Sequence, residues 1–410
     1  MEIRPILSTL LRHKTAAALI VLEIALSCAI VCNAVFVIGS RVQHMHRESG
    51  IAEDELLNID ISSLTPDRNE EAMRREDIAA LSAIPGVKAV ASVNQIPYGG
   101  NVWMSNINLQ PDQSDPTRTA SPYMDDGNLL QTLGLRVVEG RAFTPDEYLD
   151  QSEIQRAENP ASISSILVSR ATAEHLFHGE SAIGKSVYVA DDKPSRIVGV
   201  VDLLVAPGEG GLQVGDFNLQ GYDTMIYPVR VSNGQYVLRT DPARRDEVLK
   251  AAVAALNRVD PNRIINEQKT LADMRHDFYS RDRAVVWLLL AVCIALLAVT
   301  ALGIVGLASF WVQQRTRQIG VRRALGATRM QVLRYFQTEN FLLATAGIVI
   351  GMLLAFAINQ LLMSKYELPR LPWYYLPIGA ALLWALGQIA VLGPARRAAS
   401  VPPAIATRSA

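Results

Sequence analysis

Charged residues are scarce in this 410-residue chain: Asp, Glu, Lys and Arg make up 19% of it, whereas 50% is hydrophobic. About a quarter would be charged in an ordinary globular protein. Cysteine is also scarce, and all three cysteines (Cys28, Cys32 and Cys293) lie in apolar runs. Residues 41–283 contain none, which excludes a disulfide scaffold there. Gly-x-Ser-x-Gly and His-Glu-x-x-His patterns are both missing, so no motif supports hydrolase chemistry.

Long apolar runs are the main feature that the sequence does contain. A bilayer core about 30 Å thick requires about 20 apolar residues in a helix. Four segments reach that length: 15–40, 284–312, 341–363 and 373–393. The first is too long for a signal peptide, and we interpret it as a retained anchor. The chain is therefore expected to cross a membrane four times.

The charges are unevenly distributed along the chain. Residues 41–283 contain 25 Lys and Arg against 36 Asp and Glu, whereas the remainder contains 14 against 4. This acidic block argues against nucleic-acid binding, which needs clustered cations. Because Lys and Arg favour the cytoplasmic side, we expect residues 1–14, 313–340 and 394–410 in the cytoplasm. Residues 41–283 would then lie outside the cytoplasm.

The block outside the membrane is expected to be α+β. Strand, helix and strand patterns follow one another at 56–62, 70–83 and 87–95, and again at 235–240, 241–258 and 263–268. These two β-α-β units predict a split subdomain formed by residues 56–98 and 231–270. Between them, residues 99–230 are expected to form an inserted, mostly β subdomain. It contains a capping box at Thr144 and a Gly- and Pro-rich loop at 207–221.

Two motifs in this block suggest chemistry that their surroundings do not support. Residues 179–186 match the P-loop expression Gly-x₄-Gly-Lys-Ser. A P-loop follows a buried strand and opens a helix, but here a short helix precedes the segment and a strand follows it. The histidine pairs, His44 with His46 and His175 with His178, are too few to form a metal site. We therefore expect no nucleotide, cofactor or metal in this chain.

Two features within the membrane segments concern helix packing. Glu23 lies deep in the first segment, where an ionisable group is costly. We interpret it as a hydrogen-bonded contact between helices rather than a proton or coupling site, because the other segments offer no charged partner. Gly347 and Gly351 form a Gly-x-x-x-Gly face that permits close approach of another helix, in the same chain or in a second one.

The most informative segment is the connection 313–340, which we call the coupling elbow. It contains six arginines, which retention in the cytoplasm explains. Retention does not explain the apolar residues and glycines placed among the arginines. A short amphipathic helix of this kind can present an apolar face to a soluble partner. Gly326, just past the helix end, predicts a helix-turn-helix.

At these residues the chain resembles the MacB/FtsX family of ABC-transporter permeases. The family pattern is close to Arg-x-x-Glu-Ile-Gly-x-Arg-Arg-Ala-Leu-Gly-Ala, and the sequence departs from it at Gln318, where Glu is usual. The resemblance also covers the first anchor and four further stretches: 134–143, 168–185, 197–201 and 394–397. The segment that imitates a P-loop thus matches part of the family's outer domain.

The resemblance implies a non-catalytic permease subunit that transmits motion from a separate ABC ATPase. MacB carries a fused ATPase domain that this chain lacks, so two ATPase copies, with their ATP and Mg, are expected as partners. A second permease, identical or homologous, and membrane lipid are also expected. Docking into the ATPase is assigned by this analogy to Gln318, Ile319, Gly320, Val321, Arg322, Arg323, Ala324, Leu325, Gly326 and Ala327. The apolar members would sit in the ATPase groove, with Arg322 and Arg323 at its rim.

Two functions fit this organisation. The leading hypothesis is export or extraction of a substrate such as a drug, a peptide or a lipid-linked molecule, with room for a periplasmic adaptor. The alternative is a regulator that mechanically activates a periplasmic enzyme such as a cell-wall hydrolase. A ligand-sensing receptor would need a cytoplasmic signalling domain, for which the segment after Gly393 is too short. A channel is not favoured, because the apolar segments offer no continuous polar lining.

Overall fold

The computed structural model divides the chain into two compact units, a helical unit (residues 1–46 and 281–410) and an α/β unit (residues 47–280). Each unit is described by itself. The described residues are 14–64, 69–111, 113, 115–156, 160–189, 192–208, 212–214, 217–219, 221–366 and 372–400. The expected cytoplasmic tail beyond residue 400, most of the N-terminal segment 1–14 and parts of the loop 207–221 lie outside them.

Four helices in the described part of the chain are long and apolar enough to cross a membrane. They are α2 (Lys14–Met45), α9 (Ser280–Gln314), α11 (Arg329–Tyr366) and α12 (Tyr375–Ala399). Each helix also includes residues outside the predicted apolar run. Most notably, α11 begins at Arg329, so the second half of the coupling elbow continues directly into the third apolar segment as one helix.

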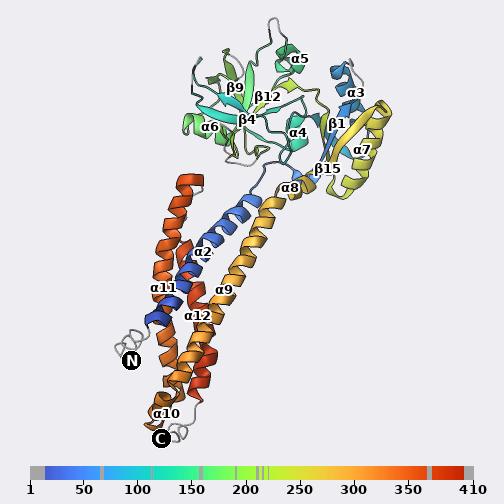
Figure 1. The fold of residues 1–410 in the computed structure, drawn as a ribbon. Coiled ribbons are helices and arrows are strands. Elements are labelled where there is room, and N and C mark those ends of the chain that lie inside the picture. Colours follow the sequence, from blue (N-terminus) through green and yellow to red (C-terminus); the bar gives the residue numbers. More distant parts are fainter. Residues whose placement is uncertain are drawn as a thin grey trace. The chain divides into compact units, whose positions relative to one another are not determined.

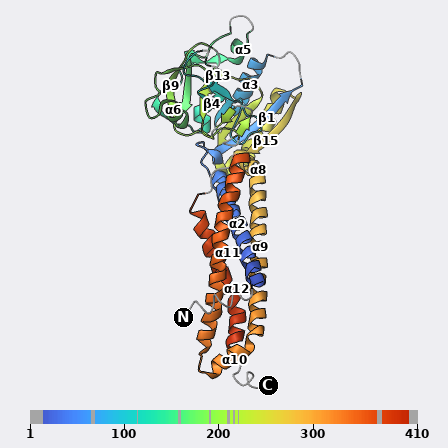
Figure 2. The same cartoon turned by 60° about the vertical axis from the view of Figure 1, so that its left-hand side comes forward.

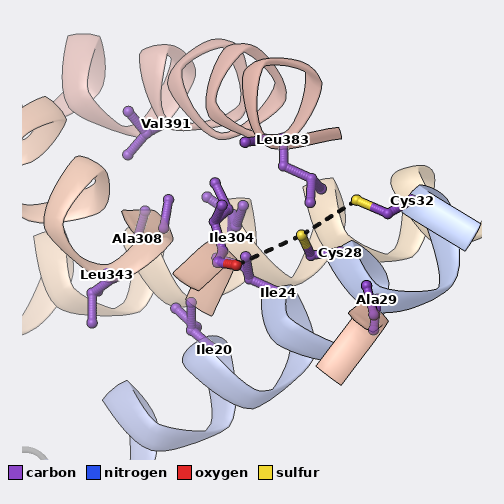
Figure 3. Close-up of a cluster of buried hydrophobic side chains, with 14 of the residues drawn as sticks. Ile20, Ile24, Cys28, Ala29, Cys32, Ile304, Ala308, Leu343, Leu383 and Val391 are labelled. Carbon is purple, nitrogen blue, oxygen red and sulfur yellow. Dashed lines mark hydrogen bonds between the residues drawn. The ribbon is translucent and has the colours of Figure 1, made fainter. Parts of the chain in front are cut away.

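The helical unit is held together around α2. Figures 1 and 2 show α2 beside α11 and α12, and Figure 3 shows the side chains that meet there. Ile24 and Cys28 of α2, Ile304 of α9, Ala344 of α11 and Leu383 of α12 belong to one buried cluster. Polar contacts supplement it: Ser27 Oγ lies 2.7 Å from Thr300 Oγ1 on α9.

The α/β unit contains two main sheets. The first has the order β15-β1-β14-β2, with every neighbouring pair antiparallel. Helices α3 and α7 pack on it through a core that includes Leu57, Leu81, Leu238 and Leu256. The elements are β1 (Leu56–Ser63), α3 (Glu70–Ser82), β2 (Val87–Ser92), β14 (Gln235–Thr240), α7 (Arg245–Val259) and β15 (Arg263–Thr270). The two expected β-α-β patterns thus contribute to a single sheet, flanked by η1 (Glu53–Glu55), η3 (Pro242–Arg244) and α8 (Leu271–Phe278).

The second sheet is formed by the intervening residues. Its strand order is β3-β4-β12-β7-β9-β5, with β8 also paired to β9, and parallel and antiparallel neighbours are mixed. The elements are β3 (Ser105–Ile107), β4 (Arg118–Met124), α4 (Leu129–Leu133), β5 (Val137–Gly140), β7 (Ser165–Ser169), α6 (Arg170–Phe177), β8 (Ser186–Val187), β9 (Ser195–Val201) and β12 (Thr224–Tyr227). Beside it, β10 (Leu212–Val214) pairs with β11 (Phe217–Leu219), and β6 (Leu149–Asp150) pairs with β13 (Val229–Arg230), as two separate two-stranded sheets. Two short helices, η2 (Pro145–Glu147) and α5 (Gln151–Ile154), lie in the same part of the chain. The expected capping box at Thr144 is present.

Buried polar groups join the two sheets. Asp126, in the loop after β4, accepts hydrogen bonds from the backbone N–H groups of Ser92 (2.8 Å) and Asn128 (3.0 Å). Burial raises the pKa of Asp126 to about 6, against the lowering effect of these two bonds. Asn94 and Gln95 donate to the carbonyl of Pro122 in β4. The junction between the sheets is therefore polar and contains a carboxyl group that titrates near neutrality.

Candidate docking elbow

The coupling elbow is a short helix followed by a tight turn. One residue, Arg315, separates the end of α9 from helix α10 (Thr316–Ala324). Its C-terminus has the Schellman pattern: Gly326 N–H donates to the Arg323 carbonyl (3.1 Å), and Ala327 N–H donates to the Arg322 carbonyl (3.0 Å). Gly326 takes φ of +99°, a backbone conformation that favours glycine. The turn expected at this glycine is therefore present.

The helix that follows the turn starts at a defined residue. Thr328 N–H donates to Gln331 Oε1 (2.9 Å), and Gln331 N–H donates back to Thr328 Oγ1 (3.3 Å). This reciprocal pair is a capping box. The two caps define where α10 ends and where α11 begins.

One side of α10 is buried within the helical unit. Ile319 is 6% exposed and packs with Val332 and Phe336 of α11 and with Ala395 and Ala398 of α12. Burying an isoleucine side chain contributes about 1.5–3 kcal/mol. Ile319 therefore attaches the elbow to its own chain. The expectation that it would sit in a partner's groove needs correction, because its surface is already covered, as is that of Gly320.

A buried ion pair adds to this attachment. Arg315 Nη1 lies 3.0 Å from both carboxylate oxygens of Glu339 on α11. The guanidinium of Arg315 also lies over the Trp311 ring, 5.6 Å from its centroid. Arg315 is 9% exposed and Glu339 is 1% exposed. Sequence reasoning missed this pair; the only signal was an acidic residue next to the third apolar run.

Among the described residues, the opposite side of α10 is uncovered. Val321 and Leu325 are exposed, Leu325 to 83%, and Ala324 lies between them on the same face. Positions three and four apart lie on one side of a helix. Gln318 and Arg322 are exposed at the edge of this face, whereas Arg323 and Ala327 are half-buried. The elbow thus presents a small apolar surface flanked by arginine, and the docking role of the segment stays a prediction.

The residues singled out for helix packing all lie against neighbouring helices of the same chain. A Cβ atom on Gly347 would lie 2.8 Å from Ile24 Cβ, and one on Gly351 would lie 2.5 Å from Cys28 Cβ. The Gly-x-x-x-Gly face is therefore occupied by α2. The carboxylate of Glu23 lies against Gly303 of α9, where an added Cβ would be 2.5 Å from Oε2.

The segment that imitates a P-loop has no phosphate-binding geometry. It follows the C-terminus of α6 and leads into β8, so it does not open a helix as a P-loop does. Lys185 lies over the Phe177 ring and pairs with Glu180. His175 pairs with the buried Asp223 through Nδ1, at 2.7 Å. Within the described ranges, no three His, Cys, Asp or Glu side chains are grouped closely enough to hold a metal ion.

Comparison with protein-family models gives two matches that together span most of the chain. Residues 17–261 match the MacB-like periplasmic core domain, and residues 290–403 match the FtsX-like permease C-terminal domain. The chain belongs to the MacB/FtsX-type ABC transporter permeases. The predicted fold class, four membrane helices with a large α+β domain of MacB-like type, is confirmed. This MacB/FtsX-type permease is a multi-pass membrane protein.

Individual relatives of this permease are distant. It is 23% identical to the uncharacterized ABC transporter permease YknZ of Bacillus subtilis, over 99% of this chain and 98% of YknZ. It is 27% identical to the macrolide export ATP-binding/permease protein MacB of Bradyrhizobium diazoefficiens, over 68% of this chain. The pyoverdine export ATP-binding/permease protein PvdT of Pseudomonas savastanoi is 25% identical over 97% of this chain. The match spans 42% of that MacB and 57% of that PvdT.

Two solved domains are also similar. The extracellular domain of YknZ covers 51% of this permease, with 17% identity and a TM-score of 0.32. The periplasmic region of MacB from Actinobacillus actinomycetemcomitans covers 56%, with 14% identity and a TM-score of 0.32.

Proposed function

We propose that this chain is the non-catalytic permease subunit of an ABC exporter, and that a separate ATPase subunit docks on the coupling elbow. The observation that supports docking is the two-sided character of α10. Its inner side is attached to the helical unit by Ile319 and by the Arg315–Glu339 pair. Its outer side leaves Val321 and Leu325 uncovered. A partner pushing on that side would move α9 and α11 with it.

A separate ATPase is favoured by the relatives' names. YknZ, which matches over nearly its whole length, is named as a permease alone, whereas MacB and PvdT are named as combined ATP-binding and permease proteins. MacB and PvdT are named for export, which supports export as the class of activity. We propose two ATPase copies, carrying ATP and Mg, and a second permease, identical or homologous, with a periplasmic adaptor as a further partner.

The proposed location is the inner membrane, with the α/β unit in the periplasm and the elbow in the cytoplasm. The supporting observation is charge: the elbow contains six arginines, whereas residues 41–283 have eleven more acidic than basic side chains, 36 against 25. In this arrangement nucleotide-driven motion at the elbow is passed along α9 and α11 toward the periplasmic side.

The experiment is co-purification of an ATPase with the tagged full chain. Leu325→Asp places a charge on the exposed apolar side of α10 and removes a leucine that burial in an interface would stabilise by about 1.5–3 kcal/mol. We expect ATPase binding to weaken at least about tenfold. Leu64→Asp, at a 65% exposed leucine of the α/β unit, is the matched control and should bind as wild type. Unchanged ATPase binding by Leu325→Asp would refute the docking assignment.

A further inference from the structure

A cleft of about 230 Å³ opens between α10 and the first turns of α11, entirely within the helical unit. Five polar side chains line it: Arg315, Gln318, Arg322, Gln331 and Tyr335. Its remaining lining is mostly apolar and includes the buried residues Ile319, Val332 and Phe336. The exposed docking residues Val321 and Leu325 do not line it. The cleft therefore borders the face proposed for the ATPase and shares Gln318 and Arg322 with its edge.

Arg315 brings positive charge to this cleft, which it lines. Its Nη1 is engaged by both oxygens of Glu339. Its Nη2 is buried and has no hydrogen-bond partner among the described residues. A buried charged donor without an acceptor costs free energy. An anion bound in the cleft would offset part of this cost through its charge.

Arg322 brings a second positive charge. Its guanidinium lies over the Tyr335 ring, 5.3 Å from the centroid, which holds it at the cleft. In the described part of the chain no carboxylate forms an ion pair with it. Arg315 and Arg322 therefore bring two guanidinium groups to a space that, among the described residues, has no carboxylate in its lining. The planar donor fork of arginine matches the oxygens of a phosphate group.

The position of the cleft indicates where such a group would come from. Arg315 directly follows Gln314, the last residue of the membrane-crossing helix α9. The cleft accordingly lies at the end of an apolar helix, where the proposed orientation places the cytoplasmic surface of the membrane. Basic pockets between membrane helices bind anionic headgroups. A ligand with a phosphate and an adjoining apolar part also fits the polar donors and apolar lining together.

We propose that this cleft binds a phosphate group, supplied by the headgroup of an anionic phospholipid at the membrane surface. Bound there, the phosphate accepts from Arg322 on α10 and from Gln331 on α11, beside the positive charge of Arg315, and so bridges the two helices. Lipid then stiffens the elbow from within.

The test uses the purified full chain in detergent and two probes. The first is phosphatidylglycerol in mixed micelles, and the second is inorganic phosphate compared with chloride at equal ionic strength. Binding is followed by thermal stability and by phospholipid retained in native mass spectrometry. Arg322→Gln removes one cleft donor. Arg317→Gln, at an exposed arginine of the same helix that does not line the cleft, makes the same charge change and serves as the control.

We expect phosphatidylglycerol to raise the unfolding temperature and Arg322→Gln to weaken its binding at least tenfold, with less than a twofold effect of Arg317→Gln. The same Arg322-dependence with inorganic phosphate alone would support the phosphate site and identify free phosphate as its source. Equal losses in both variants, or no binding of either probe, would overturn the proposal. So would an Arg322→Gln variant that keeps phosphate and lipid binding but loses the ATPase, because the cleft would then receive an acidic side chain of that partner.

Discussion

Replacing Glu339 with glutamine removes the carboxylate that faces Arg315 at the base of the coupling elbow. Arg315 Nη1 lies 3.0 Å from both oxygens, and both residues are more than nine-tenths buried. Removing one partner of a buried pair costs about 3–5 kcal/mol, since the other charge stays buried. Glutamine keeps one acceptor oxygen, so we expect the lower end, about 3 kcal/mol.

This cost is expected to appear first in α10. Ile319 N–H, which donates to the Arg315 carbonyl at 2.9 Å, is a suitable reporter for hydrogen exchange. A loss of about 3 kcal/mol corresponds to exchange faster by about 100-fold. The α/β unit, which contains neither residue, should exchange as in wild type.

A double variant provides the control. Replacing both partners with apolar residues, Arg315→Met with Glu339→Leu, leaves no uncompensated charge and should restore most of the protection in α10. If Glu339→Gln alone leaves exchange in α10 unchanged, the ion pair does not hold the elbow, and the mechanical role assigned to it is refuted.

Two further predictions concern the bundle and the α/β unit. Gly351→Val forces side-chain atoms against Cys28 and Ala25 of α2, and overpacking should cost about 1–3 kcal/mol in thermal unfolding. Gly306→Ala, where an added Cβ meets nothing within 4 Å, should be near neutral. The raised pKa of Asp126 means that the folded protein keeps a proton that the unfolded chain releases between about pH 4 and 6. The free energy of unfolding should therefore fall as pH rises through that window, by about 3 kcal/mol for a pKa raised by about two units. Asp126→Asn should abolish this part of the pH dependence when the free energy of unfolding is measured with urea. If that free energy depends on pH in the variant as it does in wild type, the prediction is wrong.

Much of the architecture could be predicted because apolar length and strand periodicity are local signals. The four membrane helices followed from runs of about 20 apolar residues, and the strands of the first sheet from alternation such as that in Leu56–Ser63. The central strands β4 and β12 were not predicted. Pro122 interrupts the pattern in β4, and β12 is a short, fully buried run whose partners lie far away in sequence.

The elbow shows the same limit at the level of single residues. Its helix, glycine turn and second helix were predicted from the position of Gly326. The sequence did not predict which apolar residue faces inward. Ile319 and Val321 are equally apolar, and only the residues that they meet on α11 and α12 decide between them. The Arg315–Glu339 pair joins residues 24 positions apart through tertiary packing, which no local pattern records.

The most direct test of the account is the side of the membrane on which the coupling elbow lies. In a background without Cys28, Cys32 and Cys293, single thiols would be placed at Leu325 of the elbow and at Leu64 of the α/β unit, both of which are exposed. A membrane-impermeant maleimide applied to intact cells with a permeable outer membrane should label the thiol at position 64. The thiol at position 325 should react only after solubilisation. Labelling of position 325 in intact cells would contradict the account, because an elbow on that side cannot meet an ATPase.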